Sequence, residues 1–212
     1  ALGVVLATDA DPLALVTIGT RLSEGIPAEQ GGTEGYDGQF NYYIARDPST
    51  AAQFIDVPAY RFQRILLPGI GWVASLGNDA LIPWIFLLVN VISLAVGTAI
   101  LEQLLVQLGV SRWYALTYGL TIGVFGAVRL SLAEPLAYAL ALGGIWLFLR
   151  RRWWLSAILF ALAILARETT VLVPLACGLY LLTQRQWKVA FPFGFMTLLP
   201  FAIWQFVLYD RL

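Results

Sequence analysis

Apolar residues dominate the second part of the chain, where six long runs are separated by short charged or polar clusters. A sustained apolar run predicts a helix that is buried in a protein or in a lipid bilayer. The helices expected on this basis cover residues 80–108, 113–130, 135–149, 153–166, 170–183 and 189–208. A helix needs about 20 residues to cross a bilayer. The first, second and last of these helices are therefore long enough to cross, and the middle three are short.

The short helices have two explanations. Either the bilayer is locally deformed around them, or they end inside the protein at a polar cavity, where non-lipid groups satisfy their last backbone groups. The second explanation requires polar side chains at one set of helix ends only, and the turns do alternate in this way. One set of turns carries six positive charges and no acid, at Arg112, Arg150, Arg151, Arg152, Arg185 and Lys188. The alternate turns combine acid and base, at Arg129 with Glu134 and at Arg167 with Glu168.

The same alternation predicts the orientation of the chain. Short loops rich in arginine and lysine stay on the cytoplasmic side of a membrane. We therefore expect the set of six positive charges to face the cytoplasm, and the N-terminal segment, Glu134, Glu168 and Asp210 to lie outside. Twelve of the thirteen acids then fall outside, and only Glu102 does not.

The first part of the chain is more polar than the rest, and this difference divides the protein into three expected parts. Residues 1–8 are expected to be the end of a first transmembrane helix, residues 9–79 an extracytoplasmic loop, and residues 80–212 a transmembrane helical bundle. The expected fold class is thus all-α: a polytopic transmembrane helical bundle with an extracytoplasmic first loop that contains short amphipathic helices. A long loop with helices of its own is usually functional.

Two helices are expected in this loop. Residues 38–46 predict a short amphipathic helix with Phe40 and Ile44 on one face and Gln39, Tyr43 and Arg46 on the other. The stretch AYRFQRILLPGIGWVASLG, residues 59–77, carries Arg61 and Arg64 one turn apart, followed by an apolar stretch. It predicts a helix that lies at the membrane surface.

Composition supports a membrane protein and narrows its chemistry. The chain is 59% hydrophobic and 12% charged, with a mean hydropathy of +0.76, far from the balance of a soluble domain. Its formal net charge of zero argues against a nucleic-acid partner. The chain has no histidine, which excludes histidine-based triads and histidine-ligated metals. The one cysteine, Cys177, lies in an apolar run and is expected to pack as a small hydrophobe.

Asp37 is the first candidate for chemistry. An aspartate directly before a helix is often only an N-cap. The functional alternative is a carboxylate at the mouth of a membrane cavity, acting as general base toward an acceptor hydroxyl or as ligand to a divalent cation. Glycines flank the Tyr36-Asp37 pair and would let the backbone approach a ligand closely. By contrast, Asp47 and Asp56, close to prolines, are expected to be turn or cap residues.

Charged residues at the outer ends of the short helices form the second group of candidates. A charged side chain costs at least about 2.5 kcal/mol at the centre of a bilayer, so such residues are usually paired or functional. Glu134 either starts a helix or serves a site. Arg167 and Glu168 either form a polar turn or supply a guanidinium that holds a phosphate. Arg61 and Arg64 would bind lipid head groups in general or one specific lipid phosphate.

The succession of segments resembles the GT-C superfamily, polytopic glycosyltransferases that use polyprenyl-phosphate-linked sugars. The resemblance covers roughly residues 34–180 and is carried by GYDGQF, by YRFQRILLPGIGWVASLG, by LAEPLAYALALGGIWLFLRRRWW and by LSAILFALAILARETTVLVP. It is strongest to bacterial members related to protein mannosyltransferases and aminoarabinose transferases. The family typically has more helices and often a soluble domain after them, so the chain resembles its N-terminal module.

The resemblance implies a function and a location. Asp37 would be the catalytic carboxylate, Arg61, Arg64 or Arg167 would grip the donor phosphate, and Glu134 would be the acid before the fourth helix of that architecture. Tyr36, Gln39, Arg46 and Glu168 would support the site. The implied partners are membrane lipid, a polyprenyl-phosphate sugar donor and an extracytoplasmic acceptor, with the site facing outward from a bacterial plasma membrane. No cofactor is certain: a divalent cation stays open, although Asp37 lacks the second adjacent acid of some relatives.

Two other functions are compatible with the pattern. The chain could be a non-catalytic transmembrane subunit of a larger membrane complex. A transporter would also place charges and broken helices along a substrate path, but no inverted repeat supports it.

Overall fold

The computed structural model describes residues 11–211 of the chain, and the expected all-α class is confirmed. Helices make up 77% of the structure, and the described residues contain no strand. Residues 1–8, expected to end a first transmembrane helix, lie outside the described residues.

The helices fall into two groups along the chain. The first part holds four short α-helices: α2 (Thr20–Ser23), α3 (Gly38–Arg46), α4 (Pro58–Arg61) and α5 (Leu66–Ser75). The second part holds α6 (Ile82–Gln107), α7 (Ala115–Gly119), α8 (Ile122–Arg129), α9 (Glu134–Leu149), α10 (Trp153–Ala166), α11 (Leu172–Thr183) and α12 (Trp187–Arg211). Short 3-10 helices connect them at Pro12–Leu15, Ala28–Gln30, Ala51–Phe54, Asp79–Leu81, Arg112–Tyr114 and Glu168–Val171.

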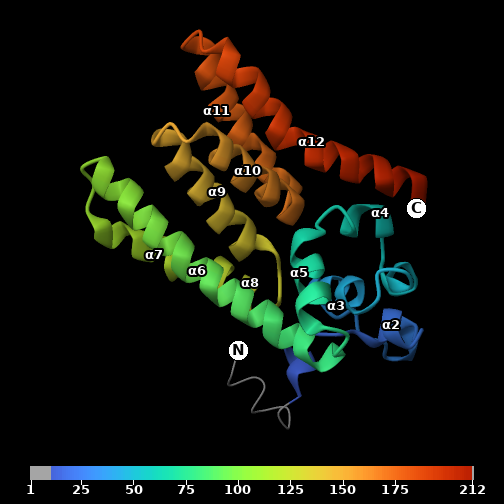
Figure 1. Ribbon diagram of the computed structural model, residues 1–212. Coiled ribbons are helices and arrows are strands. Elements are labelled where there is room, and N and C mark those ends of the chain that lie inside the picture. Colours follow the sequence, from blue (N-terminus) through green and yellow to red (C-terminus); the bar gives the residue numbers. More distant parts are fainter. Residues whose placement is uncertain (1–10, 212) are drawn as a thin grey trace.

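The long helices form a layer, and the short ones gather at one end of it. Helix α9 packs between α6 and α10, and α12 packs against α10 and α11 (Figure 1). Helices α2–α5 lie beside the beginning of α6 and the end of α12. There the Trp204 indole of α12 donates a 2.7 Å hydrogen bond to the carbonyl of Phe62. The chain therefore returns at its end to the segment that carries Arg61 and Arg64.

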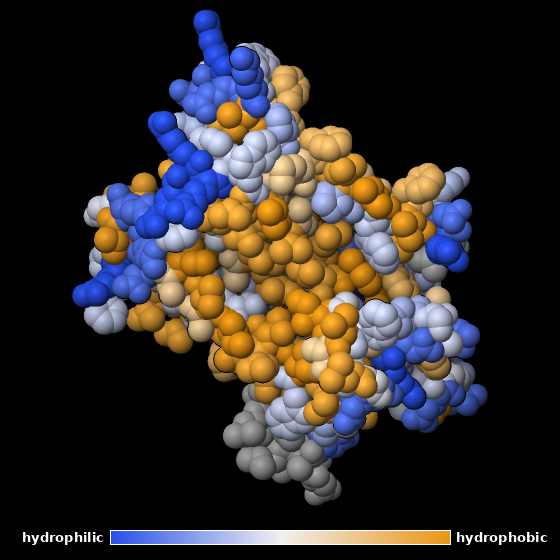
Figure 2. All heavy atoms as spheres, viewed as in Figure 1, coloured by the Kyte–Doolittle hydropathy of each residue, from blue (hydrophilic) through white to orange (hydrophobic). Residues whose placement is uncertain are grey.

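Two helices are long and apolar enough to cross a membrane, by length and composition: Asp79–Gln107 and Trp187–Arg211. Only 22% and 17% of the residues in their most apolar windows are buried within the protein. Figure 2 shows apolar surface between hydrophilic regions at opposite ends of the molecule. These helices therefore differ from the buried core helix of a water-soluble protein, which hides its apolar side chains.

The expected single helix over residues 113–130 is wrong. The chain forms α7 and α8 instead, separated by Leu120 and by an extended Thr121 at φ −60° and ψ 124°. Glycine and threonine are poor helix formers, and Gly119 lies so close to α6 that an added Cβ would come within 2.8 Å of the Thr98 hydroxyl. Neither α7 nor α8 is long enough to cross a bilayer.

Of the two helices expected in the N-terminal loop, the one over residues 38–46 is confirmed as α3, and the other differs from the prediction. Residues 59–77 break into α4 and α5, so Arg61 ends one helix and Arg64 lies in the linker to the next. Helix α3 is buried on both faces, since Gln39 and Tyr43 of its polar face are as hidden as Ile44. Tyr43 stacks on Phe54 with ring centroids 4.9 Å apart. Helix α3 is thus the core of the small N-terminal unit and not a surface helix.

Small residues bring α9 and α10 into close contact. A Cβ added to Gly144 would lie 2.5 Å from the buried Phe160 ring, and the Ser156 hydroxyl donates a 2.8 Å hydrogen bond to the Gly144 carbonyl. Because α9 and α10 are antiparallel, the beginning of α9 and the end of α10 lie at the same end of the layer. This arrangement brings Glu134 and Arg167 together beside α3, α4 and α5 (Figure 1).

Candidate functional site

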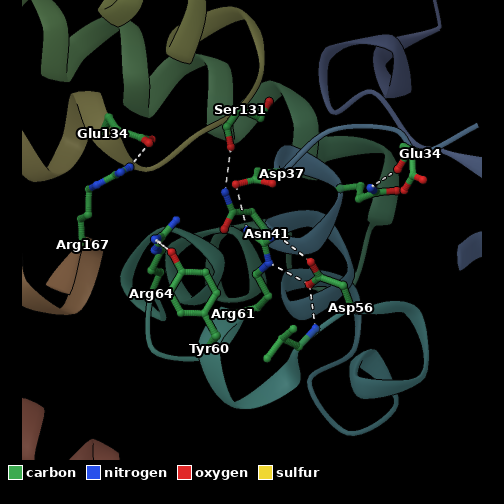
Figure 3. A network of polar contacts seen from close by, with 12 residues as sticks. Glu34, Asp37, Asn41, Asp56, Tyr60, Arg61, Arg64, Ser131, Glu134 and Arg167 are labelled. Atoms are coloured by element: carbon green, nitrogen blue, oxygen red, sulfur yellow. Dashed lines mark hydrogen bonds and ion pairs between the residues drawn. The ribbon is translucent and has the colours of Figure 1, made fainter. Parts of the chain in front are cut away.

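A small polar pocket lies where α3, the end of α4, the α4–α5 linker and the turn before α9 meet. The space between its side chains, open solvent included, is about 320 Å³, and the part that can enclose water-sized groups is about 20 Å³. It is lined by Asp37, Phe40, Asn41, Arg61, Arg64, Leu132, Ala133 and Glu134. Figure 3 shows Arg167 reaching toward Glu134 from the α10 side. Asp37, Arg61, Arg64, Glu134 and Arg167, which the sequence pattern singled out, therefore converge on one place.

Asp37 does not cap its helix, so the N-cap interpretation is wrong. The residue holds the N-cap position of α3, but its own backbone is helical and its side chain accepts no capping hydrogen bond. Its Oδ2 instead lies 2.8 Å from Nη1 of Arg61, and the side chain is 47% exposed. No hydrogen bond to Oδ1 is formed by residues 11–211. One carboxylate oxygen is thus held in place while the other is open to an incoming group.

The glycines next to Asp37 approach protein backbone. A Cβ at Gly38 would lie 2.1 Å from the Leu130 carbonyl oxygen, and one at Gly35 would lie 2.4 Å from the Gly19 nitrogen. Gly35 also has a φ of +69°, a conformation that side chains disfavour. These glycines are needed to seat Asp37 against the rest of the chain, which replaces the expectation that they admit a ligand.

Arg61 is fully occupied by two aspartates. Its Nε and Nη2 donate to the two carboxylate oxygens of Asp56 at 2.9 and 2.8 Å, and Nη1 contacts Asp37. The guanidinium also lies 4.2 Å from the centre of the Phe40 ring. The hydrogen bond from Arg61 is the main reason that the pKa of Asp56 lies below its usual value, and Asp56 raises the pKa of Arg61 in return.

Arg64 forms a two-pronged ion pair with Glu168. Its Nε and Nη2 each donate to one carboxylate oxygen at 3.0 Å, and Nη2 also contacts the Tyr60 hydroxyl. Burial is the largest influence on Glu168 and raises its pKa, but the hydrogen bond and charge of Arg64 outweigh it, so the pKa of Glu168 is lowered. Nη1 of Arg64 has no hydrogen-bond partner among the described residues.

Arg167 is the least satisfied arginine of the site. Its Nη1 pairs with Oε1 of Glu134, whereas its buried Nε has no hydrogen-bond partner in the described part of the chain. Burial, followed by the positive charge of Arg64, lowers the pKa of Arg167. A half-buried cation that faces a second cation is stabilised by an additional negative group.

The positive charges of the cluster are balanced by carboxylates. Three arginines (Arg61, Arg64 and Arg167) meet four carboxylates (Asp37, Asp56, Glu134 and Glu168), which leaves a net charge of about −1 when all are ionised. The site is therefore not a simple basic patch. Arg64 and Arg167 are each balanced by one glutamate, but each keeps an N–H without a partner among the described residues.

Three supporting residues expected from the sequence lie elsewhere. Arg46 pairs with Asp79 at 2.9 Å, outside the pocket lining. Gln39 is buried and structural, since its Oε1 accepts from the Gly19 amide and its Nε2 donates to the Glu34 carbonyl. Tyr36 is exposed and does not line the pocket.

Sequence reasoning missed three residues that build the site. Asp56 was expected to be only a turn residue, yet it also holds Arg61. Tyr60 contacts Arg64 one helical turn away, a spacing that could have revealed it. Asn41 donates a 2.9 Å hydrogen bond to the carbonyl of Ser131 across 90 residues, which no local pattern could have revealed. Asp47 is the turn residue that was expected, since its carboxylate accepts from Ser49 and Thr50.

The described residues do not form a binding set for a divalent cation. Residues 11–211 contain no group of three or more histidine, cysteine, aspartate or glutamate side chains placed to share a metal ion. Asp37 and Asp56, the two neighbouring carboxylates, share the Arg61 guanidinium instead.

Comparison of the chain with protein-family models, with curated proteins and with solved structures gives no match. The geometry of the site is therefore the basis for a proposal of function.

Proposed function

We propose that the chain is the N-terminal module of a multi-pass membrane glycosyltransferase that transfers a sugar from a polyprenyl-phosphate donor to an extracytoplasmic acceptor. The observation that carries this proposal is the convergence of Asp37, Arg64 and Glu134 on one polar pocket, with Arg167 joined to it through Glu134. The resemblance of the sequence to the GT-C superfamily agrees with it.

Embedding in a bilayer accounts for the distribution of apolar surface. Helices α6 and α12 expose most of their apolar side chains, and α8 and α11 expose large ones as well, including Ile122, Leu172 and Leu179. Exposed apolar surface on this scale is costly in water and favourable in lipid. The turns before α10 and α12 carry Arg150–Arg152 and Arg185, so the positive-inside rule directs the opposite end, which holds the pocket, away from the cytoplasm.

The pocket has two chemically different sides. Asp37, Asn41 and Glu134 contribute oxygen atoms, which accept hydrogen bonds from hydroxyl groups. Elsewhere in the pocket lies Arg64, and Arg167 lies behind Glu134, whose Oε1 it contacts; an N–H of each guanidinium lacks a partner among residues 11–211. A ligand with hydroxyls at one end and a phosphate at the other satisfies both sides. A sugar joined to a lipid phosphate is such a ligand.

The proposed mechanism is a single displacement with inversion. The hydroxyl of the acceptor loses its proton to Oδ1 of Asp37, and its oxygen attacks the anomeric carbon of the sugar. The bond between that carbon and the phosphate oxygen breaks, and the electron pair leaves with the polyprenyl phosphate. Arg64 and Arg167 stabilise the charge that develops on the phosphate, and Arg61 keeps Asp37 in position. The mechanism uses only these side chains.

An Asp37→Asn variant of the full-length protein tests the base. Asparagine keeps the size of the side chain and cannot take a proton, so we expect transfer to fall by at least about 100-fold, measured as release of undecaprenyl phosphate from undecaprenyl-phosphate sugars. Asp47→Asn is the matched control, because Asp47 lies outside the pocket and binds only its own turn. Undiminished transfer by a normally expressed Asp37→Asn protein would rule out Asp37 as the base.

The alternative, a non-catalytic subunit of a larger membrane complex, is favoured by one other feature. An apolar groove of about 180 Å³ runs between α11 and α12 and contains the buried Thr197 hydroxyl, which has no partner among the described residues. A helix of another subunit could fill this groove. Purification in fixed stoichiometry with another membrane protein, together with wild-type function of Asp37→Asn, would favour this alternative.

A further inference from the structure

Two asparagines from different helices hold the turn that precedes α9. Nδ2 of Asn41, in α3, donates a 2.9 Å hydrogen bond to the carbonyl of Ser131. Nδ2 of Asn90, in α6, donates a bond of the same length to the next carbonyl, that of Leu132. Because a carbonyl oxygen can only accept a hydrogen bond, the amide nitrogen of each asparagine must face the turn. The direction of each amide oxygen is thereby fixed.

The two amide oxygens have different surroundings. Asn90 is 0% exposed, and its Oδ1 is buried without a partner in the described part of the chain. Asn41 lines the polar pocket one helical turn after Asp37. In Figure 3 its nitrogen points to Ser131 and its oxygen lies on the other side of the amide, toward Arg64. Only Asn41 can therefore offer its oxygen to a ligand.

The turn is built to keep this amide in place. Ser131 is fully buried and has a φ of +55°, which non-glycine residues seldom adopt. Its hydroxyl donates a 3.1 Å hydrogen bond to the carbonyl of Leu15, and the Leu130 carbonyl packs directly on Gly38. Strained backbone persists where the surroundings hold it firmly, commonly at functional sites. Asn41 is thus anchored at both its helix and its amide.

We propose that Asn41 is a sugar-binding residue of the pocket, whose Oδ1 accepts a hydrogen bond from a hydroxyl of the donor sugar. The inference rests on the proposed function and adds a recognition element to it. Oδ1 of Asp37 and Oδ1 of Asn41 form a wall of acceptors, so the group that fills this side must bring O–H donors. Glu134 lies beyond this wall, where its Oε1 is held by Arg167. A phosphate, which has only acceptor oxygens when ionised, is excluded from this wall and directed to the Arg64 side.

The test compares ligands with and without a sugar on the full-length protein. The probes are undecaprenyl-phosphate mannose and undecaprenyl-phosphate glucose, with undecaprenyl methyl phosphate as a sugar-free diester of equal charge. Binding is measured by native mass spectrometry for the wild type, for Asn41→Ala and for Asn90→Ala. Asn90→Ala is the matched control, because it removes the same kind of bond to the same turn and the Asn90 side chain itself does not line the pocket.

We expect the wild type to prefer a sugar-bearing lipid. Asn41→Ala should reduce that preference about 5- to 10-fold, the value of one neutral hydrogen bond, and leave binding of the methyl diester unchanged. Asn90→Ala should keep the preference and lower only the melting temperature. If Asn41→Ala does not fold, Asn41→Ser serves in its place, because its short hydroxyl stays polar and ends before the pocket.

The contradicting outcomes separate the two proposals. Three outcomes would overturn the role of Asn41 and leave the phosphate site in place. The Asn41 variant could keep the sugar preference of the wild type, or Asn90→Ala could lose that preference equally. The third outcome is a wild type that binds the methyl diester with the same affinity as both sugar lipids. A wild type that binds none of the three lipids would overturn the proposed function, and the role of Asn41 with it.

Discussion

At the scale of single residues, the three arginines of the site have separate tasks. Arg61 is bound on all sides by Asp37 and Asp56, so it positions the carboxylate. Arg64 and Arg167 are each paired with one glutamate and retain an N–H without a partner among the described residues. The sequence suggested all three as phosphate ligands, and the geometry favours only the last two.

Replacing Arg61 by lysine tests this division. A lysine cannot form the two-pronged contact with Asp56 while reaching Asp37, so transfer should fall at least about 10-fold and stability by about 1–3 kcal/mol. Binding of undecaprenyl phosphate should change little. Arg46→Lys, at an exposed ion pair with Asp79, should cost at most about 1 kcal/mol. Lost lipid binding with retained transfer would contradict the assignment of Arg61.

The Glu168–Arg64 pair predicts a dependence of stability on pH. The pKa of Glu168 is lowered in the folded protein, so the folded state binds fewer protons than the unfolded state between the two pKa values. The stabilisation is fully present above the ordinary glutamate pKa of about 4.3 and is lost as the pH falls through the lower folded value. Melting temperatures in detergent between about pH 7 and pH 3 should therefore fall more steeply for wild type than for Glu168→Gln. Parallel curves would contradict this prediction.

At the scale of elements, the close packing of α9 and α10 aligns the two halves of the Glu134–Arg167 pair. Gly144→Ala would drive a methyl group into the buried Phe160 ring, and we expect a loss of about 1–3 kcal/mol, or roughly 2–12 °C in melting temperature. Gly178→Ala in α11 is the control, because nothing lies within 4 Å of the added Cβ. An equal effect of the two substitutions would show that this contact is not tight.

Apolar patterning was sufficient to predict α6 and α9–α12, because a long apolar run with polar ends forms few structures other than a helix. It failed for residues 113–130 and 59–77, where the breaks depend on contacts with distant segments, including Thr98 in α6 and Trp204 in α12. The candidate site was predictable in residue type, since charges at the ends of apolar helices are rarely incidental. Which arginine pairs with which carboxylate could not be predicted, because Arg64 and Glu168 are 104 residues apart and Arg167 and Glu134 are 33 residues apart.

At the scale of the whole molecule, the proposal requires the two polar ends to lie on opposite sides of a membrane. Cysteine labelling tests this in a Cys177→Ser background, which removes the one thiol of residues 1–212. A membrane-impermeant maleimide applied to intact cells should label Glu29→Cys, in the N-terminal part, and spare Arg151→Cys, in the turn between α9 and α10. Permeabilised cells should label both. Labelling of Arg151→Cys alone in intact cells would reverse the orientation and place the pocket in the cytoplasm.

The proposed function requires the end of the molecule that holds the polar pocket to bind a lipid-linked phosphate. The most direct measurement is the affinity of the purified full-length protein for undecaprenyl phosphate, compared among wild type, Arg167→Gln and Arg46→Gln. We expect Arg167→Gln to weaken binding at least about 10-fold, the effect of losing a charged hydrogen-bond donor to phosphate, and Arg46→Gln to bind as wild type does. Equal affinity of all three proteins, or no binding by any of them, would contradict it.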